Sequence, residues 1–299
     1  MSPPELYLAI DCGGTKTAAV LCAPDGTILS SALGGGSNFS YLGLDAFLNR
    51  IAEVTSSVLS TALRSPVTIT PPNEPKTRIT TPPYYLRAAW LGVAGVDSPS
   101  AISLLLPHVS ALLSVPVERL IVSNDTHLLA APLRILPDVR TAVAVVAGTG
   151  SIVVSFREGT ANAPLEGLAR VGGWGWILGD EGGGFDVGRT AVRALLAQQD
   201  TETTGVAVAR GPLREKLLKK FGVNEVMDLL GVVYAPDSAS PLPREGRLSS
   251  LCPIVFEAAF EDGDPLAIEV VRDCAHKLAM QITAVLQSSE QEVRTPPIL

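Results

Sequence analysis

The sequence predicts an α/β protein made of two similar units, each opening with strands that a glycine-rich turn connects. The short apolar run from Glu5 to Ile10 ends in such a turn, and a strand-like pattern resumes at Ala18. The same arrangement recurs, weakly, at residues 141–156. Between these regions strands and helices alternate, which gives the first unit the order βββαβαβα.

Three antiparallel strands are expected to open the first unit. Asp25-Gly26 is a typical hairpin signal, so residues 28–33 should return beside the strand at residues 18–22. A helix follows, because apolar residues then recur at the spacing of one helical face. These residues are Leu44, Phe47, Leu48, Ile51, Val54, Val58 and Leu59.

Residues 65–85 form a proline-rich insertion within the first unit. Six prolines among Thr, Asn and Lys leave this segment too little apolar surface to bury. Beyond it, the sequence predicts a buried strand at residues 88–93 and a helix at 98–113. A strand at 120–123 and a helix at 126–136 complete the unit.

The second unit begins with a strand at residues 141–147, a glycine turn and a strand at 151–156. After residue 184 the pattern is helical and shows no further strands, so we expect this unit to be incomplete at its C-terminal end. Amphipathic helices are expected at residues 185–198, 213–221, 249–261 and 265–287. We place the two units at residues 1–137 and 138–299.

Composition suggests a compact cytoplasmic protein. With 299 residues, 46% of them hydrophobic, the chain is long enough for about two domains. The net charge of −7 argues against nucleic acid as a partner. Three prolines interrupt the longest uncharged stretch, residues 98–117, which argues against a membrane span. No Cys-x-x-Cys pair and no signal-peptide pattern occur, so reduced thiols are expected at Cys12, Cys22, Cys252 and Cys274.

The two glycine turns, Gly13-Gly14-Thr15 and Gly148-Thr149-Gly150, occupy matching positions in the two units. Exposed backbone N–H groups in such turns can approach a phosphate without interference from Cβ atoms. Ordinary hairpins also use glycine, so either turn alone would be a weak signal. Neither turn is a Walker P-loop or a dinucleotide fingerprint.

Three polar residues near the expected strand ends each have a functional and a structural interpretation. Asp11 could hold Mg²⁺ near transferred phosphates, or cap a turn. Asp125 could be a general base, or the N-cap of the following helix. Asn38 could bind a hydroxylated substrate, or simply occupy a turn.

Residues 172–184 give the densest signal, because two tryptophans and two carboxylates stand among glycines. Indole rings can stack on the C–H face of a sugar while carboxylates accept its hydroxyl hydrogens. The alternative is that these tryptophans belong to the core of a glycine-rich corner.

Taken in order, these motifs resemble the N-acetylglucosamine kinase branch of the BadF/BadG/BcrA/BcrD ATPase family, in the superfamily of actin-like ATPases, sugar kinases and Hsp70 proteins. The resemblance extends from about Leu6 to Gln287, apart from the insertion. Five motifs carry it: Asp11-x-Gly-Gly-Thr-x-Thr, Ser37-Asn38, Asn124-Asp125, Gly148-Thr149-Gly150-Ser151, and Gly172-Gly173-Trp174-Gly175 through Gly179-Asp180-Glu181-Gly182. It implies two actin-like (ribonuclease H-like) lobes that close on ATP, Mg²⁺ and an amino sugar.

The resemblance also implies a role for each matching position. Asp125 corresponds to the general base that takes the proton of the sugar 6-hydroxyl, and Asp11 to a carboxylate near the metal. The implied nucleotide-binding residues are Gly13, Gly14, Thr15, Lys16, Thr17, Gly148, Thr149 and Gly150. The implied substrate-binding residues are Asn38, Asn124, Ser151, Gly173, Trp174 and Asp180.

Two departures from the family pattern affect the expected nucleotide and sugar sites. The family ends with a strand, a Gly-Gly turn that holds adenosine, and a helix, whereas no Gly-Gly follows Gly184 here. We therefore expect the second lobe to be truncated before the adenosine motif. In addition, the sugar kinases often have Gly-Ser directly after Asp-Glu, whereas this chain has Gly182-Gly183-Gly184. This difference leaves the identity of the hexosamine open.

The sequence thus predicts an ATP-dependent kinase that converts an amino sugar, most directly N-acetyl-D-glucosamine, to its 6-phosphate. The expected partners are the sugar and ATP, and a homodimer is a possible assembly. One alternative is a sugar-binding or regulatory protein without turnover. Another is an ATPase that activates a reductase or dehydratase, which would require a cluster-binding cysteine pair.

Overall fold

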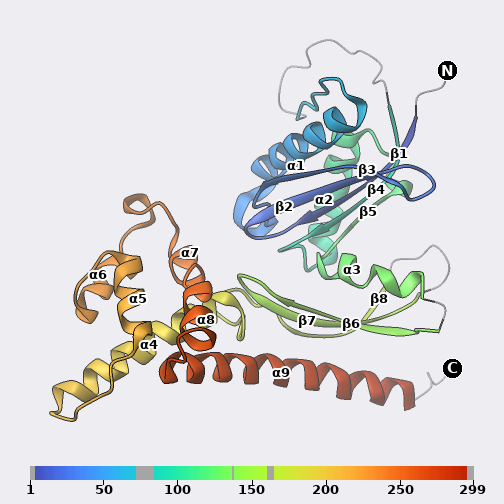
Figure 1. Cartoon of the computed structure of the whole chain (residues 1–299). Helices are drawn as coiled ribbons and strands as arrows, with labels where there is room; N and C mark the ends of the chain where they lie inside the picture. Colours follow the sequence, from blue (N-terminus) through green and yellow to red (C-terminus); the bar gives the residue numbers. More distant parts are fainter. Residues whose placement is uncertain (1–3, 72–83, 137, 160–164, 295–299) are drawn as a thin grey trace. The chain divides into compact units, whose positions relative to one another are not determined.

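The computed structural model describes residues 4–71, 84–136, 138–159 and 165–294 (Figure 1). The chain divides into two compact units. The first consists of Met1–Val139 with Glu158–Leu165, and the second of Arg140–Arg157 with Glu166–Leu299. Most of the proline-rich insertion expected at residues 65–85 lies outside the described residues.

The first unit is a five-stranded sheet with helices, and its element order confirms the predicted βββαβαβα (Figure 1). Its elements are β1 Glu5–Cys12, β2 Lys16–Cys22, β3 Ile28–Gly35, α1 Phe39–Leu63, β4 Tyr85–Val93, α2 Pro99–Leu113, β5 Leu120–Ser123 and α3 Thr126–Leu129. Short 3-10 turns are Val117–Arg119 and Ala131–Arg134.

One face of this sheet is packed against α1 and α2, which also contact each other. The strand order is β3-β2-β1-β4-β5, with β1 to β3 antiparallel and β4 and β5 parallel to β1. In β1 the alternate residues Leu6, Leu8 and Ile10 are buried, as expected of a strand covered on one face. Phe47 and Ile51 of α1 join the same core, which confirms the predicted helical face.

The carboxyl ends of β1, β4 and β5 lie at one edge of the sheet, because these strands are parallel. Asp11 of β1 is in register with Gly92 of β4, which is in register with Ser123 of β5. The first glycine turn and Asp125 therefore come to the same edge. Ligands of open α/β sheets bind at such edges.

Two helices of the first unit differ from the sequence-based expectation. Helix α1 begins at Phe39 and contains a break at Gly43, whose φ is 71°. The apolar periodicity in the sequence starts only after this break, so the first turn of α1 was not predicted. Helix α3 ends at Leu129 instead of continuing to residue 136, and Pro132, which lacks a backbone N–H, stands in a separate 3-10 turn.

The second unit opens with three antiparallel strands in the order β6-β7-β8. These are β6 Thr141–Ala147, β7 Ser151–Arg157 and β8 Glu166–Gly172. The expectation of only two strands here was wrong. Strand β8 escaped detection because it contains two glycines and two charged residues and has mostly exposed or half-buried side chains, so it shows no apolar alternation.

Helices form the rest of the second unit. They are α4 Gly184–Thr203, α5 Pro212–Phe221, α6 Leu229–Val233, α7 Arg244–Ser249, α8 Cys252–Phe260 and α9 Pro265–Arg294, with 3-10 turns at Val226–Asp228 and Asp237–Ala239. The helix expected at 249–261 is thus divided between α7 and α8. Helix α9 lies along the three-stranded sheet and also packs against α4 and α8 (Figure 1). Within the described ranges, no helix combines the length and apolar character that a membrane crossing requires.

Candidate active site

The first glycine turn connects β1 to β2 and is fastened to the residues after β3. Gly13 N–H donates to Lys16 O at 3.0 Å, and Ser37 N–H donates to Gly13 O at 2.9 Å. A Cβ atom at Gly14 would meet nothing within 4 Å, so the turn has an open side. Among the described residues, no acceptor is found for the N–H groups of Gly14 and Thr15. Free N–H groups in an open turn suit an anion.

Thr17, implied as part of the first phosphate loop, faces the interior instead. Its side chain is fully buried, and its hydroxyl donates to Gly35 O at 2.6 Å. It also hydrogen-bonds with Ser37 Oγ at 2.6 Å. Thr17 therefore braces β2 against β3 and supports the turn from behind.

Asp11 is the last residue but one of β1, beside the turn, and its side chain is exposed. Partial shielding by neighbouring atoms raises its pKa, while the positive charge of Lys16 opposes that rise. Protein-bound Mg²⁺ in phosphoryl-transfer sites commonly takes one or two carboxylates and completes its octahedron with water and phosphate oxygens. The exposed carboxylate of Asp11 fits such an ion, while the free N–H groups of the turn suit the phosphate oxygens.

Asp125 stands just beyond β5, at the same edge as Asp11. Burial raises the pKa of Asp125 to about 6, with a further contribution from the negative charge of Asp11, while the nearby Thr126 N–H opposes the rise. A Cβ atom at Gly92 would lie 2.5 Å from Leu128 Cδ1 and 3.0 Å from Asp125 Cα. Only glycine at position 92 therefore lets Asp125 and α3 approach β4 this closely.

Asp125 occupies the N-cap position of helix α3, but the capping hydrogen bonds come from the side chain of Asn124. Its Oδ1 accepts hydrogen bonds from Thr126 N–H at 3.1 Å and Thr126 Oγ1 at 2.7 Å. Its Nδ2 donates to Asp97 Oδ1 at 2.9 Å. Asp125 makes no capping bond. The amide implied as a substrate ligand is thus engaged within the protein, and Asp125 occupies the expected N-cap position without making a side-chain cap.

Asn38 precedes α1 and carries an unsatisfied side-chain oxygen. Its Oδ1 is buried and has no hydrogen-bond partner within the described parts of the chain, and the side chain does not cap α1. A Cβ atom at Gly95 would lie 2.5 Å from this oxygen, so a glycine leaves the space around it. Leaving a buried acceptor unpaired costs about 1–3 kcal/mol. A ligand that donates a hydrogen bond to Asn38 Oδ1 would remove that cost.

The second glycine turn connects β6 to β7 and is fixed to the start of α4. Gly184 N–H donates to Gly148 O at 2.7 Å, and Phe185 N–H donates to Thr149 O at 3.0 Å. These bonds satisfy two of the N–H groups that a helix start leaves free. In the part of the chain that the structure describes, Thr149 N–H and Gly150 N–H have no backbone acceptor. A Cβ atom at Gly148 would meet nothing within 4 Å.

Asp180 lies against the second glycine turn. It is 6% exposed and adopts a left-handed backbone with a φ of 63°. Gly175 N–H donates to its Oδ1 at 3.3 Å, and a Cβ atom at Gly150 would collide with the carboxylate. Burial raises the pKa of Asp180, while the N–H groups of Gly175 and Ser151 oppose the rise.

Ser151 and Gly173 join β7 to the loop that carries Asp180. Ser151 is 2% exposed, and its hydroxyl donates to Glu181 O at 2.7 Å. Gly173 N–H donates to Ser151 O at 2.8 Å. With a φ of 70° and Ile152 Cδ1 only 2.7 Å from the position of a Cβ, Gly173 has to be glycine. The Ser151 hydroxyl, like that of Thr17, is used internally.

The two tryptophans of the glycine-rich loop differ in environment. Trp174 is 66% exposed, with the guanidinium of Arg170 5.3 Å from its ring centre. Arg170 also donates to Gly173 O at 2.7 Å. Trp176 packs against Phe185 with ring centres 5.2 Å apart. Trp174 is therefore available to a ligand, whereas Trp176 is structural.

Asp186 is a buried charge that sequence reasoning missed. It is fully buried in the first turn of α4 and accepts Gly182 N–H at 3.0 Å and Arg189 Nη2 at 2.7 Å. The available signal was an acidic residue in the first turn of an expected helix, which usually means no more than a favourable helix dipole. Gly92 was missed because a lone glycine in an apolar run gives no hint of what approaches it.

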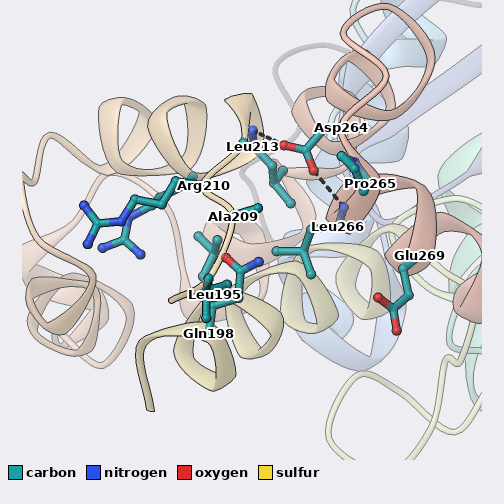
Figure 2. A pocket seen from close by; sticks show the side chains of 12 residues that line it. Leu195, Gln198, Ala209, Arg210, Leu213, Asp264, Pro265, Leu266 and Glu269 are labelled. Atoms are coloured by element: carbon teal, nitrogen blue, oxygen red, sulfur yellow. Dashed lines mark hydrogen bonds between the residues drawn. The ribbon is translucent and has the colours of Figure 1, made fainter. Parts of the chain in front are cut away.

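A pocket of about 270 Å³ lies elsewhere in the second unit, among α4, α5 and the start of α9 (Figure 2). Asp264 holds its wall, accepting hydrogen bonds from Leu213 N–H and Leu266 N–H, both at 2.8 Å. None of the sequence-predicted site residues lines this pocket. Its lining is Leu195, Gln198, Val208, Ala209, Arg210, Gly211, Leu213, Arg214, Asp264, Pro265, Leu266 and Glu269.

Each unit thus gathers its own predicted residues. The first unit combines an open glycine turn, an exposed carboxylate and a partly buried carboxyl whose pKa is near 6. That set can hold phosphate and accept a proton near neutral pH. The second combines an open glycine turn, a buried carboxylate and an exposed indole. That set can hold phosphate and hydroxyl-bearing rings.

The sequence is similar to a family of ATPases and to two kinases of amino sugars. A model of the BadF/BadG/BcrA/BcrD ATPase family matches residues 8–296. An N-acetyl-D-glucosamine kinase of Dictyostelium discoideum is 27% identical over 284 residues, covering 95% of this chain and 80% of that protein. An N-acetylmuramic acid/N-acetylglucosamine kinase of Clostridium acetobutylicum is 29% identical over 206 residues, covering 67% of this chain and 58% of that protein.

The fold is also similar to that of a solved structure. A protein of Chromobacterium violaceum, assigned as an N-acetylglucosamine kinase, superposes with a TM-score of 0.64 and 23% identity. The superposition covers 94% of this chain and 82% of that one. The predicted α/β fold class with actin-like lobes is therefore confirmed.

Proposed function

Because this chain belongs to the BadF/BadG/BcrA/BcrD ATPase family, we propose that it is an ATP-dependent kinase that phosphorylates the 6-hydroxyl of an amino sugar, N-acetyl-D-glucosamine above all. The observation that carries the proposal is the carboxyl edge of the first sheet. There Asp125, with a pKa near 6, shares one edge with Asp11 and an open glycine turn. The names of the two amino-sugar kinases similar in sequence support the choice of substrate class.

Asp125 is the proposed general base. A pKa of about 6 leaves it mostly ionised at neutral pH, yet basic enough to accept a hydroxyl proton as the new bond to phosphorus forms. Positioned bases of this kind contribute about 10²–10⁴-fold to the rate. Asn124 holds the base in place by capping α3 and bonding to Asp97.

The glycine turns are proposed to hold the phosphates of ATP. The N–H groups of Gly14 and Thr15 in one turn, and of Thr149 and Gly150 in the other, are the donors. Asp11 would hold Mg²⁺, directly or through water. When bound, that ion neutralises charge on the transferred phosphoryl group. Fixed donors of this kind contribute mainly by position and electrostatics.

The proposed ligands of the sugar are two polar side chains and one aromatic side chain. Asn38 Oδ1 lacks a donor, which suits a hydroxyl or amide hydrogen of the substrate. Asp180 offers a carboxylate held by Gly175 N–H, and Trp174 offers an exposed indole face. Aromatic faces stack on sugar C–H surfaces, while carboxylates select for hydroxyl positions.

The cysteines do not favour the alternative in which the protein activates an iron–sulfur enzyme. Cluster ligation requires thiolates. Cys12 and Cys274 are buried, so neither is exposed at a surface where a cluster could be shared with a second subunit. Burial also raises the pKa of both thiols to about 12. Cys252 is half-buried, and its pKa is also raised by burial.

A coupled assay of ADP release with a panel of hexosamines tests the proposal. We expect ADP release to depend on N-acetylglucosamine and to be much slower with glucose, which lacks the acetamido group. N-acetylmuramic acid distinguishes an enzyme that tolerates a 3-substituent from one that does not. ADP release that is independent of every sugar would overturn the proposed kinase activity.

A further inference from the structure

The turn that carries Asp180 is held from outside by helix α9. Gln281 of α9 donates through Nε2 to Glu181 O at 2.7 Å. A Cβ atom at Gly182 would lie 2.8 Å from Leu278 Cβ and 2.9 Å from Cys274 O, so α9 touches the turn backbone directly. The helix thus reaches the turn at two consecutive residues.

A buried charge connects this turn to the same helix. Asp186 Oδ2 accepts Gly182 N–H at 3.0 Å and lies 3.3 Å from Lys277 Nζ of α9. Its other oxygen accepts Arg189 Nη2 at 2.7 Å. Lys277 also pairs with Asp273 at 2.8 Å. Burial alone would raise the pKa of Asp186, but these partners together hold it below its ordinary value.

Asp180 itself needs such support. Among the described residues, the others with positive φ that are not glycine, Arg64 and Ser114, are helix C-caps, where this conformation is usual. Asp180 has no helix before it to fix its backbone. A left-handed conformation outside glycine persists only where neighbouring contacts impose it. The bonds from α9 to Glu181 O and from Asp186 to Gly182 N–H are among those contacts, beside the bond from Gly183 N–H to Asp180 O at 3.0 Å.

We propose that Asp186 and Lys277 are positioning residues that keep the Asp180 turn in its sugar-binding conformation and thereby set the affinity for the sugar. The proposal rests on the proposed function in one respect, because it takes Asp180 as a sugar ligand. Asp186 acts by holding Gly182 N–H. Lys277 acts by keeping Asp186 ionised and aimed at the turn, since a hydrogen bond to a carboxylate is stronger than one to a neutral carboxyl.

Lys277→Met tests the proposal, because methionine keeps most of the side-chain length and removes the charge. Lys216→Met is the matched control. Lys216 also pairs with two carboxylates, Glu257 and Asp262, and its side chain is 27% exposed against 32% for Lys277. It lies on α5, among contacts that do not include the Asp180 turn.

The first measurement is hydrogen–deuterium exchange in the protein without ligand. Peptides that cover residues 179–183 should exchange about tenfold faster in Lys277→Met than in wild type, the factor that corresponds to losing one charge-assisted hydrogen bond. Lys216→Met should match wild type there. This measurement does not require any activity. It therefore tests whether Lys277 holds the Asp180 turn in place even if the proposed kinase function fails.

The second measurement is steady-state kinetics. In Lys277→Met the KM for N-acetylglucosamine should rise about tenfold, while kcat and the KM for ATP stay within about twofold. Asp186→Asn, which keeps an acceptor for Gly182 N–H, should lose less sugar affinity than Asp186→Ala. Exchange and sugar KM in Lys277→Met equal to those of Lys216→Met would overturn the proposal. Equal losses in the two Asp186 variants would overturn the role of its hydrogen bond.

Discussion

Replacing Asp125 by asparagine should remove activity and at the same time stabilise the protein at neutral pH. The amide is nearly isosteric but cannot take a proton, so kcat should fall by at least about 10²-fold. The gain in stability follows from the pKa of about 6, which is above the ordinary value of 3.8. Ionising Asp125 is therefore easier in the unfolded chain than in the folded protein.

The magnitude follows from the difference between the two pKa values. About two pKa units correspond to about 3 kcal/mol once the carboxyl is fully ionised in both states, and this is an upper value because Asp125 is not completely buried. The folded pKa lies above the unfolded one, so the penalty is absent below pH 3.8 and grows as pH rises towards 6. By proton linkage, roughly half of this upper value is present at pH 5 and nearly all of it at pH 7.5.

Urea unfolding of wild type and Asp125→Asn at these two pH values measures the effect. The free energy of unfolding of the variant should exceed that of wild type by more at pH 7.5 than at pH 5. Asp25→Asn is the control, because hydrogen bonding to Thr27 N–H lowers the pKa of Asp25, so this variant should show no gain at pH 7.5. In wild type, kcat/KM should also decline below about pH 6 as the base becomes protonated. Near-normal turnover in Asp125→Asn, or equal stability at both pH values, would refute the reasoning.

Four further substitutions separate packing from binding. In steady-state kinetics, Gly150→Ala should raise the sugar KM at least about tenfold, because its Cβ would displace the Asp180 carboxylate. Gly148→Ala has space for its Cβ and should raise only the KM for ATP. Gly92→Ala should destabilise the protein by about 1–3 kcal/mol in urea unfolding, because the Cβ collides with helix α3; an unchanged midpoint would contradict that packing. Trp174→Ala should change stability by no more than about 0.5 kcal/mol but weaken sugar binding in calorimetry, and unchanged binding would remove its assigned role.

Much of the first unit could be predicted because its signals are local. Alternating burial along β1 and the apolar spacing from Phe47 to Leu59 follow directly from sequence periodicity. The position of Asp11 and of Asp125 near the end of a strand could also be predicted, because each residue follows an apolar run. The register that aligns Asp11 with Gly92 required the structure, since sequence patterns do not fix which residues of parallel strands pair.

Other features depend on contacts between distant residues and left no local trace. Strand β8 lacks alternation because most of its side chains are not buried. Whether a polar group binds substrate or its own protein also depends on distant partners. The side chain of Asn124 donates a hydrogen bond to Asp97, and the hydroxyl of Ser151 donates one to Glu181 O. Both residues belong to motifs that favoured contact with a ligand. The ion pair of Asp186 with Lys277 could not be predicted, because helix α9 brings Lys277 close to Asp186 only in the folded protein.

The most direct test of the central account is to identify the phosphorylated product. Wild type, ATP, Mg²⁺ and N-acetylglucosamine are combined, and the mixture is followed by ³¹P and ¹H NMR. The account predicts a sugar phosphate whose phosphorus couples to the two protons of carbon 6, formed in equal amount with ADP, and no such product with Asp125→Asn. Phosphate on another hydroxyl, or ADP accompanied only by inorganic phosphate, would contradict it.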